Sequence, residues 1–121
     1  MQLTYKTLVN ASQGMREISN IKLPIKAAIA VALTIKKFQN EVDVFNALAK
    51  QLREPYMHFD DKGRKVFNEA HREEAEKKFE ELLAQEIDLD VKPITASTFG
   101  SIDIAPGLLL AAGPFIDLDN K

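Results

Sequence analysis

Four lysines, Lys22, Lys26, Lys36 and Lys37, are the residues of this sequence best suited to binding chemistry. Lys22 and Lys26 flank the expected start of a long helix, where unpaired N–H groups and the helix dipole favour an anion. Lys36 and Lys37 follow about three turns further along the same helix. We therefore predict that these lysines bind an anion such as a phosphate group. The alternative is that they only solvate an exposed helix face, as long basic side chains commonly do.

The sequence contains few residues that could catalyse a reaction or bind a metal ion. The chain has no cysteine, which excludes thiolate zinc sites, cysteine nucleophiles and disulfides, and its histidines are only His58 and His71. Gly-rich phosphate loops, nucleophile elbows and paired-histidine zinc motifs are absent. The segment 60–63 starts like a calcium loop but lacks the later oxygen ligands, so it predicts a turn. We expect a protein that is not an enzyme, with no catalytic residue, metal or cofactor.

Charge is distributed unevenly along the 121 residues, although the formal net charge is only −2. Residues 1–53 carry eight basic and three acidic side chains, whereas residues 54–86 carry ten acidic and six basic ones. The basic half suits an anionic ligand, or it complements the acidic part of the same chain or of a second subunit. The acidic balance, without an arginine cluster or a run of aromatic residues, argues against nucleic acid as a partner.

The clearest structural pattern predicts one helix over residues 23–53. Apolar residues recur there in steps of three and four, at Ala28, Val31, Ile35, Phe38, Val42, Phe45, Ala49 and Leu52. The first half of this helix is apolar nearly all round, which requires cover on every side. We therefore predict a homo-oligomer with this interface: Val31, Ile35, Phe38, Val42 and Phe45. The alternative is that a sheet or hairpin of the same chain covers the helix.

The remaining pattern predicts a single domain over residues 1–121 in the α+β class. A first helix over 4–18 and a short connection predict an antiparallel helical hairpin with the long helix. Runs at 56–59 and 64–67 flank an Asp-rich turn and predict a β-hairpin or an extended loop, and an acidic third helix follows to about residue 85. Alternation at 87–92 and a short run at 101–104 predict a small C-terminal β-sheet, with a short helix over 108–112. The run at 115–118 is either a last strand of this sheet or an apolar segment that packs on the core.

Two stretches resemble a known group of proteins: KLPIKAAIAVALTIKKFQNEV, residues 22–42, and QEIDLDVKPITASTFGSIDIAPGLLLAAGPFIDL, residues 85–118. Both are similar to small, mostly uncharacterised proteins encoded by tailed bacteriophages and prophages, with a Lys-Leu-Pro-x-Lys helix start and a Pro-Phe-Ile block near the end. The segment 11–14 is less Leu-rich than this family, and Gly107 and Gly113 stand where helix formers are commoner. The resemblance implies a phage genome as origin and leaves the ends of the first and last helices open.

These observations together predict a phage-encoded accessory protein that acts by binding. We expect it to inhibit a host antiphage defence, either by binding a host protein or by sequestering an anionic nucleotide signal. The alternatives are a virion or tail assembly factor and a nucleic-acid-associated accessory protein. No segment has the length of apolar residues needed for a membrane span or a signal peptide, so we expect the host bacterial cytoplasm and no membrane partner.

Overall fold

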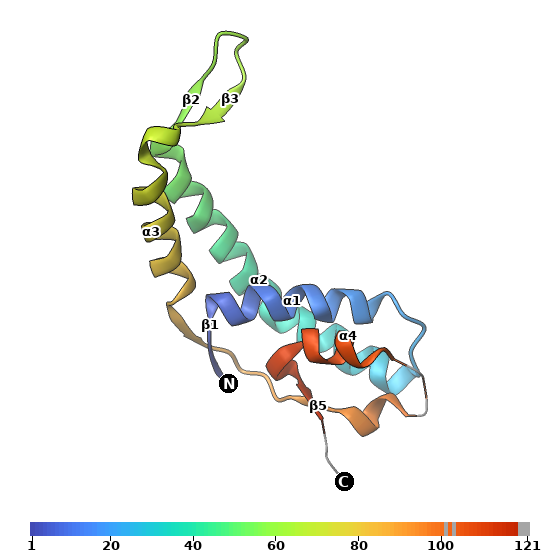
Figure 1. The fold of residues 1–121 in the computed structure, drawn as a ribbon. Coiled ribbons are helices and arrows are strands. Elements are labelled where there is room, and N and C mark those ends of the chain that lie inside the picture. Colours follow the sequence, from blue (N-terminus) through green and yellow to red (C-terminus); the bar gives the residue numbers. More distant parts are fainter. Residues whose placement is uncertain (101, 103, 119–121) are drawn as a thin grey trace.

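The computed structural model describes residues 1–100, 102 and 104–118 and shows an α+β fold. Figure 1 shows a body, built around α1, the first half of α2 and α4, and an arm that leaves it, built from the second half of α2 and α3. The helices are α1 (Tyr5–Ser19), α2 (Ile25–Arg53), α3 (Arg72–Leu83) and α4 (Pro106–Ala111). The strands are β1 (Gln2–Thr4), β2 (Met57–Phe59), β3 (Lys65–Phe67), β4 (Glu86–Asp88), β5 (Ile94–Thr95) and β6 (Ile116–Asp117).

The two N-terminal helices form the predicted hairpin. α1 begins after Thr4, whose side-chain oxygen accepts a hydrogen bond from the backbone N–H of Thr7 at 3.2 Å. α2 is continuous over 29 residues and begins at Ile25, two residues later than predicted, because Pro24 has an extended backbone with ψ of 149°. It ends at Arg53, and a 3-10 turn over Glu54–Tyr56 follows, since Pro55 lacks the N–H that a longer helix needs.

One face of α2 is buried within the single chain. Its buried residues recur in steps of three and four, at Ala27, Val31, Thr34, Phe38, Val42, Phe45 and Ala49. The helices α1 and α3 and the C-terminal segment of the same chain pack on this face. The predicted oligomer interface is corrected accordingly: Val31, Phe38, Val42 and Phe45 lie in the core of one chain, and Ile35 is partly buried at its edge. The first half of α2 is covered on this side only, and Ile25, Ile29 and Leu33 are exposed in the single chain.

Two of the three two-stranded sheets pair segments that lie far apart in the sequence. β1 pairs antiparallel with β4, and the N-terminal ammonium donates a hydrogen bond to the carbonyl of Leu89 at 2.7 Å. The strand predicted at 87–92 is therefore shorter, because β1 offers only three residues before α1 begins. β5 pairs in parallel with β6, which confirms the small C-terminal sheet. The strand predicted at 101–104 is not observed: Ile102 and Ile104 are in no strand, and residues 101 and 103 lie outside the described residues.

The arm ends in the predicted hairpin of β2 and β3. Gly63 adopts a φ of 76° in its turn, and the Asp60 carboxylate accepts hydrogen bonds from the backbone N–H groups of Lys62 and Arg64. These hydrogen bonds hold the pKa of Asp60 below its usual value. The acidic helix that follows, α3, begins at Arg72, after a 3-10 turn capped by Asn68.

Gly14 allows α1 and α4 to pack with their backbones in contact. A Cβ placed on Gly14 would lie 2.5 Å from the carbonyl carbon of Ala111 and 2.7 Å from the backbone nitrogen of Ala112. No side chain fits between backbones at that separation. Glycine in the middle of α1 costs about 1 kcal/mol in helix propensity relative to alanine. The close contact with α4 nevertheless requires a glycine at this position.

Replacing Gly14 with alanine should lower the free energy of unfolding by about 1–3 kcal/mol, as overpacked sites do, despite the better helix propensity of alanine. Chemical denaturation of the variant measures this change. Gly107→Ala is the matched control, because nothing lies within 4 Å of the position of its Cβ and it belongs to α4. Equal or higher stability of Gly14→Ala would contradict the close contact of α1 and α4.

Phe45 joins α2 to both neighbouring helices, and its removal should be costly. Its ring centroid lies 5.4 Å from that of Tyr5 and 5.9 Å from that of Phe79. We expect Phe45→Ala to lower the free energy of unfolding by about 3–5 kcal/mol. Phe59→Ala, at a side chain that is 71% exposed, should change it by less than about 0.5 kcal/mol. Similar losses in the two variants would show that Phe45 is not part of the core.

Candidate functional site

A hollow of about 460 Å³ lies between the first half of α2 and the segment 90–98. Its lining from α2 consists of Lys26, Ala30, Leu33, Thr34 and Lys37, and its lining from the segment consists of Asp90, Val91, Lys92, Pro93, Ile94, Thr95 and Thr98. The lining therefore combines three lysines, three threonines and one carboxylate with apolar side chains. Small-molecule sites combine an apolar lining with a few polar groups in this way.

The helical repeat explains why Lys26 and Lys37 belong to one site. They are eleven residues apart, which is about three turns, so both side chains leave α2 in nearly the same direction. Lys26 and Lys37 are about 16 Å apart along the helix axis, and Ala30, Leu33 and Thr34 lie between them. An elongated ligand rather than a single phosphate ion suits a pair with this separation.

The third lysine comes from a segment distant in the sequence. Leu89 and Val91 are buried, whereas Asp90 and Lys92 are exposed, so successive side chains of this segment alternate between the core and the surface. The pairing of β5 with β6 fixes the end of this segment next to α2. Lys92 therefore lies beside lysines that precede it by more than fifty residues.

Hydroxyl groups of the lining are already ordered by hydrogen bonds. Thr34 is buried and donates to the carbonyl of Ala30 at 2.9 Å, which leaves its oxygen lone pairs as acceptors. The hydroxyls of Thr95 and Thr98 lie 3.0 Å apart and share a hydrogen bond. The three threonines therefore add uncharged polar groups to the lining of the hollow.

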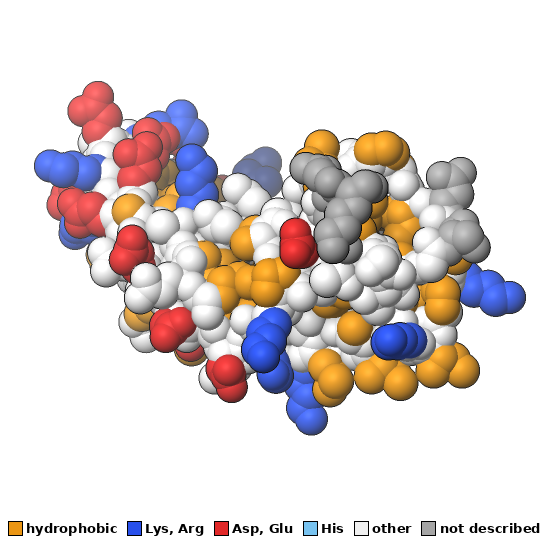
Figure 2. Space-filling model, turned by 90° about the horizontal axis from the view of Figure 1, so that it is seen from below, with side chains coloured by type: hydrophobic (Ala, Val, Ile, Leu, Met, Phe, Trp, Pro, Cys, Tyr) orange, Lys and Arg blue, Asp and Glu red, His pale blue; other side chains and the backbone are white. Residues whose placement is uncertain are grey.

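The electrostatics of the hollow favour an anion. From residue 18 to residue 40 the chain contains no acidic residue, and Asp90 is the one carboxylate of the lining. Among the described residues, Lys26, Lys37 and Lys92 take part in no ion pair. Figure 2 shows basic side chains beside hydrophobic ones at the bottom of the view, while most of the acidic side chains visible gather on the left, over the arm.

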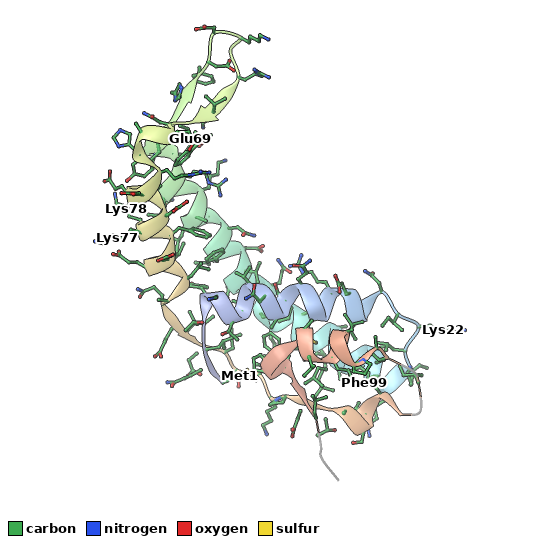
Figure 3. The ribbon with its side chains drawn as sticks, viewed as in Figure 1. Met1, Lys22, Glu69, Lys77, Lys78 and Phe99 are labelled. Carbon is green, nitrogen blue, oxygen red and sulfur yellow. The ribbon has the colours of Figure 1, made fainter. Side chains whose placement is uncertain are left out.

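The structure brings two of the four predicted lysines to this site. Lys26 and Lys37 line the hollow, whereas Lys22 and Lys36 do not. Lys22 lies in the connection between α1 and α2 and points away from the body (Figure 3). Lys36 is exposed and leaves α2 about 100° away from Lys37, toward the opposite side of the helix from the core.

Sequence reasoning missed Lys92, Thr95 and Thr98. The alternation at 87–92 did indicate that Lys92 is exposed, but it gave no information about the neighbour of this segment. That neighbour is set by the parallel pairing of β5 and β6, two short strands about twenty residues apart. Local patterns do not encode which strands pair at that separation.

Among the described residues, one other hollow, of about 470 Å³, is lined by three basic side chains and one acidic one, Lys50, Arg53, Lys65 and Glu54, but there Lys65 is paired with Glu54. Asp88 lies 3.3 Å from the N-terminal ammonium, an ion pair that explains its position without a catalytic role. His71 pairs with Glu74 on the surface at 3.6 Å, and His58 is exposed on β2. In the part of the chain that the structure describes, no group of three or more His, Cys, Asp or Glu residues could hold a metal ion.

A second hollow, of about 530 Å³, lies on the arm between the end of α2 and α3. Apolar side chains, among them Leu52, Phe79 and Leu83, form much of its lining. Arg53 and Arg72 stand at its rim together with glutamates, so opposite charges balance there. This hollow lacks the excess of positive charge that distinguishes the first.

Comparison with known proteins gave no match to a family model, a curated protein or a solved structure. Within the described residues, no helix combines the length and the apolar character needed to cross a membrane.

Proposed function

We propose that this protein binds a phosphate-bearing small molecule of the nucleotide type in the hollow between α2 and the segment 90–98. The observation that carries the proposal is the convergence of Lys26, Lys37 and Lys92 from two separate segments on one hollow. A volume of about 460 Å³ lies in the range of small-molecule sites. The protein acts by binding alone and catalyses no reaction.

The lining matches the two chemical parts of such a ligand. The three ammonium groups donate hydrogen bonds to phosphate oxygens, and such charge-assisted bonds are stronger than neutral ones. The side chains of Leu33 and Pro93 offer apolar surface to a base or sugar. Asp90 accepts hydrogen bonds from an amino group, and its charge disfavours a ligand that presents phosphate at that end of the hollow.

The biological role follows from the resemblance to proteins of tailed phages. A non-enzymatic protein that binds a nucleotide-type anion sequesters a signal on which a host antiphage defence depends. In this proposal the protein acts in the host bacterial cytoplasm as an inhibitor of that defence. This role rests on the phage resemblance together with the basic hollow.

Cyclic dinucleotides, which carry two phosphates and two bases, are the probes for this site. A ligand that binds the folded state alone raises the melting temperature, and saturating probe should raise it by several degrees. The variants Lys37→Glu and Lys92→Glu should each weaken binding by about tenfold or more, because each removes a charge-assisted bond and adds repulsion. Thermal denaturation and isothermal titration calorimetry measure both effects.

Lys36→Glu is the matched control, because it makes the same charge change one residue away and outside the hollow. It should bind the probe nearly as wild type does. If Lys36→Glu weakens binding as much as Lys37→Glu, the effect is one of net charge, and the hollow is not the site. Absence of any thermal shift with all probes would overturn the proposal.

A virion or tail assembly factor is the second candidate, and the β2–β3 hairpin favours it. Phe59 is 71% exposed on this hairpin, which projects from the end of the arm (Figure 1). An exposed aromatic residue on a projecting element suits docking to another protein. Under this candidate, Phe59→Asp abolishes incorporation into virions, whereas Lys37→Glu leaves it unchanged. Retention on duplex DNA that falls with salt would instead support the nucleic-acid-associated alternative.

A further inference from the structure

Three aliphatic side chains on the first half of α2 are turned toward solvent and form an apolar patch. They are Ile25, Ile29 and Leu33, which are 80%, 55% and 54% exposed. Ile29 precedes Phe38 of the core by nine residues, about two and a half turns, so the patch lies opposite the buried face of α2. Figure 2 shows hydrophobic side chains in a row beside basic ones at the bottom edge of the molecule. Aliphatic side chains in line along one helix face mark an interaction surface.

Positive charge surrounds the apolar patch. Lys36 leaves α2 on the same side as Ile29, about two turns further along. The stretch from residue 18 to residue 40 contains no acidic residue. All of its lysines are exposed: Lys22, Lys26, Lys36 and Lys37. The first half of α2 therefore combines exposed aliphatic side chains with charge of one sign.

The acidic helix of the arm lies on the other side of α2. There α3 packs on α2 through Phe79 and Phe45, whose ring centroids are 5.9 Å apart. Phe45 follows Ile29 by sixteen residues, so the helical repeat places the two about 160° apart around α2. On the outward side, the exposed Asp43 marks the end of the basic region. The apolar patch therefore faces away from the glutamates of α3.

We propose that the apolar patch and its lysines bind the surface of a bilayer that contains anionic phospholipids. The three aliphatic side chains enter the layer just below the headgroups, and the lysines pair with lipid phosphates. Lysine suits this position because its apolar stem is buried beside the patch while its ammonium group reaches the headgroups. The contact is peripheral, since no helix among the described residues can cross a membrane.

Charge and composition favour a lipid surface over a protein partner. Two copies of this chain packed patch on patch would bring their lysines together, and like charges repel. Protein interfaces obtain much of their affinity from Trp, Tyr and Arg, none of which occurs between residues 18 and 40. The expectation of no membrane partner rests on the absence of a spanning segment, and a contact with the bilayer surface requires no span.

The inference goes beyond the proposed function and does not rest on it. Ile25 and Ile29 lie outside the lining of the hollow, whereas Leu33 borders both the hollow and the patch. A substitution at Ile29 therefore separates the two sites. It should change binding to lipid and leave binding of a cyclic dinucleotide unchanged.

Sedimentation with lipid vesicles tests the proposal. The protein should bind vesicles of equal parts phosphatidylglycerol and phosphatidylcholine much more tightly than vesicles of phosphatidylcholine alone. Ile29→Asp should weaken binding by about tenfold or more, because it removes an apolar contact and adds a negative charge. Its circular dichroism spectrum should not change, since this side chain is outside the core. Phe59→Asp makes the same charge change at an exposed apolar residue of the β2–β3 hairpin and should bind as wild type does.

The contribution of the lysines is measured in the same assay. Lys36→Gln should weaken binding to the anionic vesicles by about fivefold, as expected for one basic side chain near an anionic surface. Lys62→Gln is the matched control, because it removes one exposed lysine from the turn of the hairpin. It should leave binding nearly unchanged.

A fluorescent probe tests which side of α2 meets the lipid. The chain has no cysteine, so Ile29→Cys provides a single attachment point for nitrobenzoxadiazole. Its emission should shift to the blue and increase when anionic vesicles are added, because the probe enters an apolar layer. The same probe attached to Phe59→Cys should show no such change.

Several results would overturn the proposal. They are absence of binding to the anionic vesicles, equal binding to both kinds of vesicle, full binding by Ile29→Asp, and an unchanged probe at position 29. A dimer that Ile29→Asp converts to monomers, without any binding to vesicles, would assign the patch to a second copy instead. Vesicle binding by a protein that binds no cyclic dinucleotide would contradict the proposed function alone.

Discussion

The stack of Phe38 on Phe115 is the contact on which the rest of the body depends. The two ring centroids lie 5.0 Å apart with an interplanar angle of 30°, and neither side chain is exposed to solvent. Phe38 stands in the middle of α2, and Phe115 belongs to the C-terminal segment directly before β6. Burial of two aromatic rings supplies a large apolar contribution at one point and fixes where the end of the chain lies. α4, immediately before this segment, is thereby held on Gly14 of α1.

The position of the candidate site depends on that contact. Because Phe115 is fixed on α2, Ile116 lies where it can pair with Ile94 in the parallel β5–β6 contact. The segment before β5 is thereby held along α2, and its alternation places Val91 in the core and Lys92 at the hollow. Three lysines are brought together by apolar packing alone. The stability of the core, rather than attraction between charged groups, holds together the two segments that carry these lysines.

Periodicity predicted the helices well and the long-range contacts poorly. The spacing of Val31, Phe38, Val42 and Phe45 identified the buried face of α2, but it did not reveal that the same chain covers it. An apolar stripe on a helix requires a partner and does not specify which one. The residues that do point outward, Ile25 and Ile29 among them, lie outside that stripe. For the site, helical geometry joined Lys26 to Lys37, while Lys92 depended on a pairing of two-residue strands that no local pattern encodes.

The central claim is that one hollow, and not the general basic character of α2, holds a phosphate-bearing ligand. Nuclear magnetic resonance titration of the isotope-labelled protein with a cyclic dinucleotide tests it most directly. Saturable shifts confined to the amides of the lining, in particular Thr34, Lys92, Thr95 and Thr98, are the predicted result. Shifts of Lys22 and Lys36 that match those of Lys26 and Lys37, or changes that never saturate, would contradict the account.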